Sequence, residues 1–315
     1  MILVADVGGT HTRLALATQQ DGRWQLSPPQ IQPTGAEFEV LVAEFLREAG
    51  SPRLEAFACS GAGPVGDDGG VRLTNAAVHL RPGALARAAG VAQVTLVNDF
   101  AAIAHAIPTL SAADVSCLGG GPGRNDATRL VLGPGTGLGV AAVTPCNGNW
   151  KVLAGEGGNA DLAPRNEEQL QIWRRLQTGG ERVFAERVLS GSGLERLYSA
   201  VVCGEQRAAA EIARAAWRGE PESRRVIEIF ADWLGSYAGS LALIVGAQGG
   251  IYLGGGILPA WGERFPAKIF LTALVDKRPP YDAYLREIPV FLITHPQPGL
   301  LGLAALAQAD LLRKC

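Results

Sequence analysis

The sequence predicts an α/β protein built from two domains. At 315 residues, the chain is longer than the ~250–300 residues at which a single hydrophobic core stops growing. Short apolar stretches typical of strands alternate along it with amphipathic stretches of helical period. A strand, a turn containing Gly-Thr and a second strand open the chain, and the same arrangement returns near residue 130. This repeat indicates an internal duplication.

Composition and cysteine spacing exclude several classes of protein. The chain is 47% hydrophobic with a net charge of −2, which argues against disorder and against a nucleic-acid binder held by phosphate charge. The cysteines form no CxxC pair, and the four histidines have no metal-ligand spacing, so we expect neither a zinc site nor a disulfide framework. Reduced thiols, and an N-terminus with no basic segment or cleavage site, favour a cytoplasmic protein without a signal peptide. The cysteines are Cys59, Cys117, Cys146, Cys203 and Cys315.

One uncharged stretch, residues 233–262, allows two interpretations. Its length is that of a membrane span. However, glycines at 249–250 and 254–256 and the proline at 259 interrupt it. These breakers favour a buried helix over about 226–247, followed by a buried strand, and hence no membrane association.

The remaining elements follow from local patterns. Apolar runs bounded by glycine, proline or polar turns predict strands over 2–7, 12–17, 54–59, 94–97, 250–253 and 290–293, and a hairpin over 130–143. A third strand follows the Asp21-Gly22 turn. Amphipathic spacing predicts helices over 37–49 and 100–107, mainly helical structure from 166 to 247, and a last helix over 298–313. The glycine-rich segment 117–126 is expected to be a loop near a domain boundary.

The two Gly-Thr turns are candidate phosphate sites. Successive backbone N–H groups in a turn can bind an anion, and glycine allows a phosphate to approach closely. Asp6 stands just before the first turn, Gly8-Gly9-Thr10, and could hold Mg²⁺ directly or through water. The turn could also be an ordinary hairpin turn. The second turn, 133–139, makes the pair more specific, because two such hairpins can hold two ends of a polyphosphate.

Three further positions carry groups suited to chemistry, and each has a plain structural alternative. Asn98-Asp99 follows a predicted strand, where Asp99 could accept a hydroxyl proton, although both residues are also good helix N-caps. Glu156 and Glu186 suit a polyol, because carboxylates bond hydroxyls in fixed directions, but a helical glutamate is more commonly on a solvated face. The glycines at 254–256 could let a flat base approach, or could form a tight strand-to-helix turn.

The ordered set of motifs resembles the bacterial ATP-dependent glucokinases of the hexokinase and actin-like ATPase superfamily. The resemblance runs from residue 2 to about 306. It rests on Asp6-Val7-Gly8-Gly9-Thr10, Asn98-Asp99-Phe100, Gly135-Thr136-Gly137-Leu138-Gly139, Gly155-Glu156-Gly157-Gly158, Glu186-Arg187-Val188-Leu189-Ser190-Gly191, Gly254-Gly255-Gly256-Ile257 and Pro298-Gly299-Leu300-Leu301-Gly302. Each motif is weak alone, but their order is specific.

The resemblance implies a fold, a reaction and its ligands. The fold is the two-domain, actin-like (ribonuclease H-like) α/β fold, with mixed sheets flanked by helices and a cleft between the domains. The smaller domain would comprise 1–109 and 297–315, and the larger 110–296. The reaction is phosphorylation of glucose at O6, with ATP and Mg²⁺ as cofactors. A homodimer is a further family expectation.

The resemblance also implies roles for individual residues. Asp99 matches the catalytic base, and Asn98 the amide that orients the sugar. Glu156, Asn159 and Glu186 stand at sugar-binding positions, and Asp6 at the metal position. The residues at nucleotide positions are Ala5, Asp6, Val7, Gly8, Gly9, Thr10, Gly135, Thr136 and Gly255.

One departure from the family pattern bears on the substrate. Asn159 stands where the family usually has a histidine that contacts the sugar. An asparagine is shorter, although it can still donate and accept hydrogen bonds. The change keeps two alternatives open: a kinase for another hexose or hexosamine, and a catalytically weak sugar-binding regulatory protein of the same fold.

Overall fold

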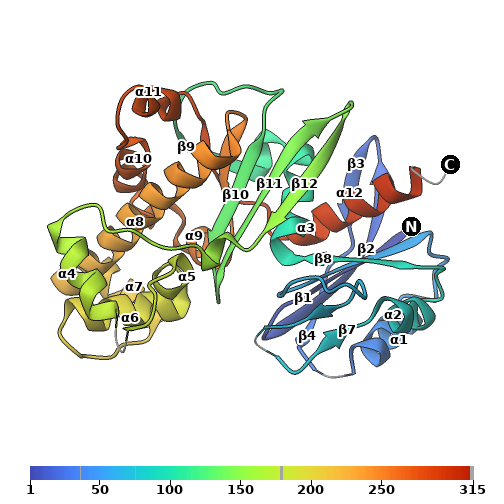
Figure 1. The fold of residues 1–315 in the computed structure, drawn as a ribbon. Coiled ribbons are helices and arrows are strands. Elements are labelled where there is room, and N and C mark those ends of the chain that lie inside the picture. The colour runs from blue at the N-terminus through green and yellow to red at the C-terminus, as the bar shows by residue number, and fades with distance from the viewer. Residues whose placement is uncertain (36, 75, 178–179, 313–315) are drawn as a thin grey trace. The chain divides into compact units, whose positions relative to one another are not determined.

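The computed structural model describes residues 1–35, 37–74, 76–177 and 180–312. The chain forms two compact units (Figure 1). Unit 1 comprises Met1–Ser111 and His295–Cys315, and unit 2 comprises Ala112–Thr294. The C-terminal segment therefore returns to the unit in which the chain begins.

Unit 1 is built on a mixed sheet with the strand order β3-β2-β1-β5-β8, and β4 pairs with β2. β1 runs antiparallel to β2 and parallel to β5, which is parallel to β8. A separate two-stranded sheet pairs β6 with β7. The strands are β1 (Ile2–Val7), β2 (His11–Gln20), β3 (Arg23–Leu26), β4 (Gln30–Pro33), β5 (Ala56–Gly61), β6 (Val71–Arg72), β7 (His79–Leu80) and β8 (Val94–Asn98).

Helices cover both faces of this sheet, and the buried side chains of β1 alternate between the two hydrophobic cores that result. Leu3, Ala5 and Val7 pack in the core that includes residues of α1 (Phe38–Glu48) and α2 (Pro82–Ala89). Ile2 and Val4 pack in the other core, with residues of α3 (Asp99–Ala106) and α12 (Pro298–Leu312). The helix α3 continues into the short 3-10 helix η1 (Ile107–Thr109).

Unit 2 repeats the strand arrangement of unit 1. Its sheet has the order β12-β11-β10-β13-β14-β9, and β10 is antiparallel to its hairpin partner and parallel to the later strand on its other side. This parallel between β1 and β10 is the pattern that a duplication would leave. The strands are β9 (Val115–Gly119), β10 (Arg129–Pro134), β11 (Leu138–Cys146), β12 (Asn149–Gly155), β13 (Gly250–Leu253) and β14 (Val290–Ile293).

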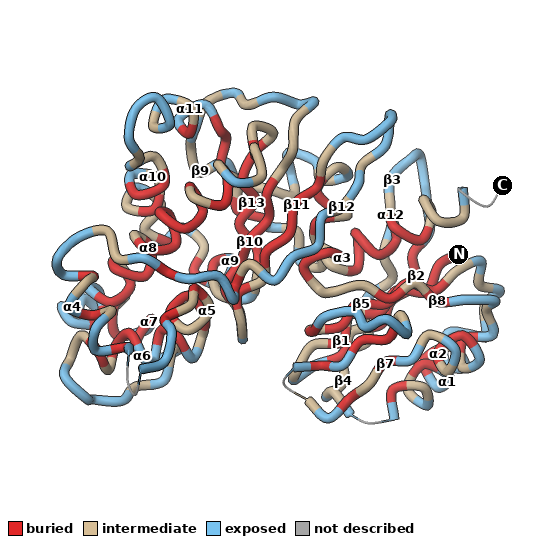
Figure 2. Tube along the Cα trace, in the orientation of Figure 1, coloured by how far each residue is buried: buried red, intermediate tan, exposed pale blue. Residues whose placement is uncertain are grey.

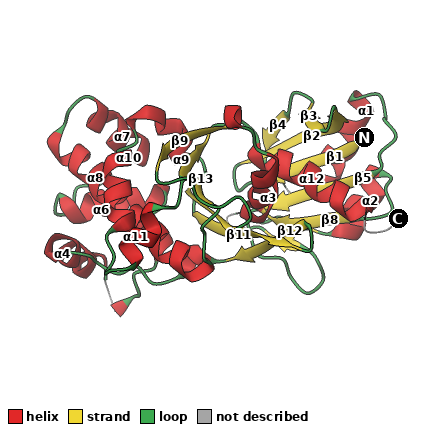
Figure 3. Ribbon diagram, turned by 90° about the horizontal axis from the view of Figure 1, so that it is seen from above, coloured by secondary structure: helices red, strands yellow, loops and turns green. Residues whose placement is uncertain are grey.

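The helices of unit 2 gather on one side of its sheet (Figure 3). The long helix α8 lies at the centre of this layer, and buried residues follow it and the strands β10 and β13 (Figure 2). The helices are α4 (Glu167–Leu176), α5 (Ala185–Val188), α6 (Gly191–Val201), α7 (Ala209–Trp217), α8 (Pro221–Val245), α9 (Ile257–Trp261), α10 (Ala267–Val275) and α11 (Tyr281–Arg286), with 3-10 helices η2 (Ala112–Asp114), η3 (Gly157–Asn159) and η5 (Gly262–Arg264).

Most strands and helices expected from local patterns are present, and two outcomes carry information. The segment 117–126 is not wholly a loop, since β9 includes its first residues and pairs with β14. The uncharged stretch divides at Gly246, whose left-handed conformation ends α8 before the buried strand β13 begins. Across the described residues, no helix combines the length and apolarity that crossing a membrane requires.

Candidate active site

The first Gly-Thr turn links β1 to β2, as expected, and is held by a residue far along the chain. Gly8 N donates to His11 O at 3.0 Å within the turn. Thr34, which follows β4, donates its hydroxyl to Gly8 O at 2.7 Å and its N–H to Thr10 O at 3.0 Å. Since these bonds use carbonyl oxygens, they fix the turn without consuming the N–H groups of Gly9 or Thr10. Thr10 itself is exposed.

Asp6 lies on the face of β1 that also carries Ile2 and Val4, and it is partly buried. Its Oδ1 accepts a hydrogen bond from Ser60 Oγ at 2.7 Å, and its Oδ2 is 3.7 Å from Arg13 Nη1. Burial raises the pKa of Asp6, while the Ser60 hydrogen bond and the Arg13 charge act in the opposite direction. The carboxylate is thus held in place beside the turn by two side chains from neighbouring strands.

Asp6 fits a metal that is shared with a substrate better than a metal held by protein alone. Mg²⁺ in kinase sites usually takes one or two carboxylates together with substrate phosphates and waters. The described part of the chain contains no group of three or more His, Cys, Asp or Glu side chains placed to hold a metal ion. A single carboxylate next to a phosphate-type turn meets the first requirement.

Asn98 and Asp99 lie at the junction of β8 and α3. Asn98 is the N-cap of α3, and its Oδ1 accepts from Phe100 N at 2.8 Å and Ala101 N at 3.4 Å. The capping interpretation of Asn98 is therefore confirmed, and its Nδ2 also donates to Gly63 O at 3.3 Å. Asp99 is the first residue of the helix, with Oδ1 2.9 Å from Phe100 N. Because the cap fixes the backbone at the start of α3, it also fixes the direction in which the Asp99 side chain projects.

In unit 1, the strand pairing brings these groups to one edge of the sheet. β1, β5 and β8 are parallel, with Val7 paired to Gly61 and Gly61 paired to Asn98. The first turn and Asp99 both follow the carboxyl ends of these strands, which is where ligands bind in open α/β sheets.

The second Gly-Thr turn links β10 to β11 and packs against the turn that follows β13. A Cβ added at Gly133 would lie 2.3 Å from the carbonyl carbon of Gly254, so only glycine fits where these two backbone segments meet. Gly255 has a φ of +79°, and a Cβ there would lie 2.4 Å from Pro134 O. Gly135 N donates to Gly137 O at 2.8 Å, and Gly135 O accepts from Gly191 N at 2.8 Å. Thr136 is exposed at the tip.

Glu186 does not lie on a solvated helix face, as the commoner alternative would have it. It comes from the short helix α5, and its Oε2 accepts from Leu138 N at 2.8 Å. The carboxylate thereby caps the start of β11 directly after the second turn. Its second oxygen, Oε1, is the one suited to a further hydrogen bond.

Glu156 and Asn159 flank the glycines of η3, and both are exposed. Backbone hydrogen bonds connect the segment after η3 to the segment that carries Glu186: Leu162 N donates to Val183 O at 3.0 Å, and Ala185 N to Ala160 O at 2.8 Å. Although Glu156 as a whole is exposed, partial burial of its carboxylate raises its pKa, and the charge of Glu186 raises it further. The two carboxylates therefore act on each other within unit 2.

The structure thus assembles two groups of predicted residues. Unit 1 gathers the first turn with Asp6, Asn98 and Asp99, and unit 2 gathers the second turn with Gly255, Glu156, Asn159 and Glu186. Sequence reasoning missed the residues that hold them, namely Arg13, Ser60, Thr34 and Tyr237. Ser60 pairs with Asp6 in the register of β1 and β5, but that register could not be read from local sequence.

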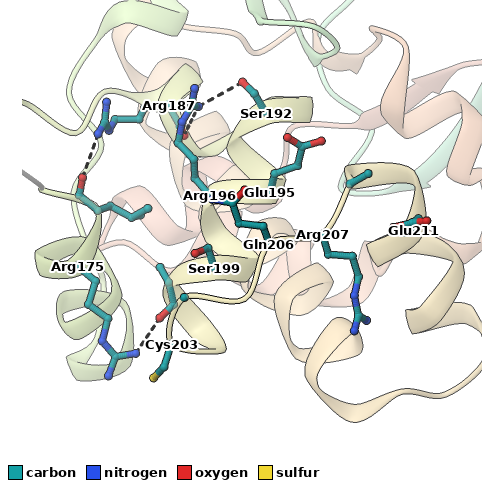
Figure 4. Close-up of a pocket in the computed structure, with 14 residues that line it drawn as sticks. Arg175, Arg187, Ser192, Glu195, Arg196, Ser199, Cys203, Gln206, Arg207 and Glu211 are labelled. Carbon is teal, nitrogen blue, oxygen red and sulfur yellow. Dashed lines mark hydrogen bonds between the residues drawn. The ribbon is translucent and has the colours of Figure 1, made fainter.

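A separate groove of about 850 Å³ lies in unit 2, beside α6 and the loop that follows it. Figure 4 shows arginine side chains around it, including Arg175, Arg187 and Arg196. Arg175 Nη1 donates to Ala200 O at 2.8 Å, and Arg196 Nη1 donates to Arg187 O at 3.2 Å. None of the predicted site residues lines this groove.

Comparisons with known proteins agree on one family. The family model described as Glucokinase matches residues 3–310. The chain belongs to the glucokinase family. A glucokinase of Chromobacterium violaceum is 40% identical over 312 residues, covering 96% of this chain and 88% of the relative. The chain is accordingly a glucose kinase, a phosphotransferase with an alcohol group as acceptor.

Solved structures support the same fold. The crystal structure of a glucokinase from an Antarctic psychrotroph has a TM-score of 0.87 and 32% identity, covering 98% of both chains. A glucokinase of Streptomyces griseus, solved with glucose and AMPPNP, has a TM-score of 0.64 and 20% identity, covering 98% of this chain and 99% of its own. The actin-like α/β fold class expected from the sequence is confirmed.

Proposed function

We propose that the protein transfers the γ-phosphoryl group of ATP to O6 of glucose, with Asp99 as the general base. The two compact units would be the two domains expected from the sequence. Unit 1 would supply the base and the first phosphate turn, and unit 2 the sugar carboxylates and the second phosphate turn. The observation that carries this proposal is that each unit contains a Gly-Thr hairpin with carboxylates beside it, in a chain that belongs to the glucokinase family.

Asp99 is suited to take the proton of the sugar hydroxyl. It stands at the carboxyl end of β8, and the Asn98 cap holds the backbone that carries it. A positioned base of this kind contributes about 10²–10⁴-fold to a rate. The Oδ1 of Asn98 is engaged in capping, so its contribution to the sugar would come through the remaining N–H of its amide.

The nucleotide would be held mainly by backbone groups. The chain has no lysine in either turn, so turn N–H groups must provide most of the donors for the phosphates. Gly135, Thr136 and Gly255 would bind one end of ATP, and the turn 8–10 the other. A Mg²⁺ ion bound with the nucleotide would neutralise phosphate charge, and Asp6 would hold it directly or through water. Positioning and charge stabilisation supply most of the acceleration in reactions of this type.

Glu156, Asn159 and Glu186 would bind the sugar hydroxyls. Burial raises the pKa of Glu156, and the charge of Glu186 raises it further, so the ionised Glu156 carboxylate is in an unfavourable environment until it meets hydroxyl donors. A polyol between them would donate to both and separate their charges. Glucose binding would therefore relieve an unfavourable interaction that exists in the free protein.

A coupled assay of ADP release over a panel of sugars tests the function. Glucose should give the highest kcat/KM in the panel, and the signal should require both ATP and sugar. A higher kcat/KM for mannose or an N-acetylated hexosamine would favour the second candidate, a kinase for another hexose, which the Asn159 departure supports. Sugar binding without ADP release would instead indicate the regulatory alternative.

A further inference from the structure

Polar side chains of the helix α8 bond to the segment 157–165, which follows Glu156 and includes Asn159. The other surroundings of α8 are mostly apolar. Most of the buried residues of α8 belong to the hydrophobic core of unit 2. Three of its side chains, two of which also pack in that core, bond to the segment 157–165, which begins directly after Glu156. These are Asp232, Trp233 and Tyr237. Polar side chains in such a core are placed where they find partners, because an unpaired one is costly.

Tyr237 bonds to the turn that carries two of the proposed sugar ligands. Its hydroxyl donates to Gly157 O, the residue directly after Glu156. Burial raises the pKa of Tyr237 to about 12, so the hydroxyl keeps its proton at any physiological pH. Gly157 O also accepts from Ala160 N at 3.0 Å, which closes η3. Tyr237 therefore fixes the same carbonyl that shapes the turn between Glu156 and Asn159.

Trp233 bonds to the same segment six residues further on. Its Nε1 donates to Ala163 O at 3.0 Å, and it lies one helical turn before Tyr237, so both side chains project from one face of α8. Trp173 of α4 adds a third donor, from its Nε1 to Leu162 O at 2.9 Å. Three ring donors thus hold three backbone carbonyls of one irregular segment.

An ion pair holds the end of the segment. Arg165 Nη2 lies 2.8 Å from Asp232 Oδ1, and its Nη1 bonds to Asp276. Gln169 Nε2 donates to Asp232 Oδ2 at 2.5 Å, and Arg165 N donates to Gln169 Oε1 at 2.8 Å. The arginine and the aspartate are each about one-fifth exposed, so water screens this pair less than a surface pair.

The segment transmits its position to Glu186 as well. It pairs with the chain around Val183 and Ala185 through backbone hydrogen bonds, and Glu186 follows immediately. Fixing the segment on α8 therefore fixes the relative placement of Glu156, Asn159 and Glu186. A rigid helix is a better support for such a set than a glycine-rich loop alone.

From these contacts we propose that Asp232, Trp233 and Tyr237 of α8 are positioning residues for the sugar ligands, with Tyr237 acting most directly. This proposal rests on the proposed function of the site. In this role the three side chains act through the backbone that they bond to, and they need no contact with the substrate. They hold the backbone between Glu156 and Arg165 in the one arrangement that presents the carboxylates to a hexose.

The substitution Tyr237→Phe tests the proposal, because it removes the hydroxyl and keeps the buried ring. The matched control is Tyr198→Phe, which removes a buried tyrosine hydroxyl of the same unit that bonds to Glu205 at 3.3 Å. Loss of one neutral hydrogen bond should raise the glucose KM of Tyr237→Phe by about 2- to 10-fold. Its kcat at saturating glucose should be unchanged, and its glucose Kd by calorimetry without ATP should rise by the same factor as KM. Trp233→Phe should act in the same direction.

The outcomes separate this proposal from the proposed function. Equal melting temperatures for the two tyrosine variants, with a raised KM only in Tyr237→Phe, support a positioning role. An unchanged KM and Kd in both Tyr237→Phe and Trp233→Phe, in a wild-type background that phosphorylates glucose, would overturn this proposal alone. A wild-type protein that binds no hexose would overturn the proposed function and this proposal together.

Discussion

The hairpin β1–β2 in unit 1 and the hairpin β10–β11 in unit 2 share a local design and differ in their surroundings. Each runs from a buried strand through a Gly-Thr turn into an antiparallel strand. The first turn has Asp6 beside it, held by Ser60 and Arg13. The second has no acid on its own strand, and at Gly133 it admits no side chain. Its carboxylate, Glu186, comes from α5, far along the chain.

The difference teaches that a repeated turn takes its chemistry from what packs against it. In unit 1 the neighbours are strands of the same sheet, which hold one carboxylate before the turn and another, Asp99, at the end of β8. In unit 2 the neighbours are α5 and η3, which bring two carboxylates close enough to repel each other. In the proposed function, unit 1 would supply the metal ligand and the base, whereas unit 2 would supply a backbone–phosphate contact and the carboxylates for a polyol.

The largest expected effect follows from placing the base in unit 1. Asp99→Asn should lower kcat by about 10²–10⁴-fold, because the amide cannot accept the hydroxyl proton. Glucose affinity should change much less, since the amide can still hydrogen-bond to the alcohol. The contrasting variant in unit 2, Glu186→Gln, should act mainly on glucose KM. Steady-state kinetics at saturating ATP measure both, and near wild-type turnover for Asp99→Asn would remove Asp99 from the role of base.

The next-largest expected effect distinguishes the two Gly-Thr turns by whether each can accommodate a side chain in place of a glycine. Gly133→Ala should lower the melting temperature by roughly 2–12 °C, since overpacking costs about 1–3 kcal/mol and the new Cβ meets backbone. Gly155→Ala is the matched control, because nothing lies within 4 Å of a Cβ at that position. Gly9→Val in the first turn should instead weaken ATP binding while the fold survives. Equal melting temperatures for the two alanine variants would contradict the close packing of the second turn.

A smaller effect concerns the sugar ligands of unit 2. Asn159→His should lower the glucose KM several-fold, because an imidazole reaches farther than a carboxamide and restores one hydrogen bond worth about 0.5–1.5 kcal/mol. Asn159 is exposed beside Glu156, so the larger ring can be accommodated without repacking a core. Kinetics with glucose and mannose measure the change. A histidine variant with unchanged or weaker glucose binding would indicate that Asn159 is matched to another sugar.

The smallest effect is the contribution to stability of the Glu156 carboxylate, which is partly buried and lies near the charge of Glu186. The pKa of Glu156 is raised in the folded protein, so the fold favours its protonated form; the resulting stabilisation is full below the ordinary pKa of 4.5 and is lost as pH rises through the raised value. Glu156→Gln should therefore melt slightly higher than wild type at pH 8 and equally at pH 3.5. Glu211→Gln, on the exposed face of α7, is the control. A difference that is larger at pH 3.5 than at pH 8 would reverse the sign of this interaction.

The sequence alone determined the elements and the inventory of chemical groups. Hydrophobic period and glycine punctuation located strands such as Gly250–Leu253 and Val290–Ile293, because these signals are local. The ordered motifs named the family. The sequence also left Asn98-Asp99 open between a helix cap and a catalytic pair. The structure shows that Asn98 is the N-cap of α3 and that Asp99 is the first residue of that helix, directly after β8.

Only the tertiary structure decided how these groups are supported. Ser60 reaches Asp6 because of the register between two strands that are about fifty residues apart in the sequence, and Glu186 reaches Leu138 N because α5 packs under the second turn. Tyr237 reads in the sequence as one more apolar position of a buried helix, yet its hydroxyl meets Gly157 eighty residues away. Such contacts form where segments that are distant in the sequence meet in the fold. Local propensity depends on neighbouring residues, so it carries no information about which distant segments meet.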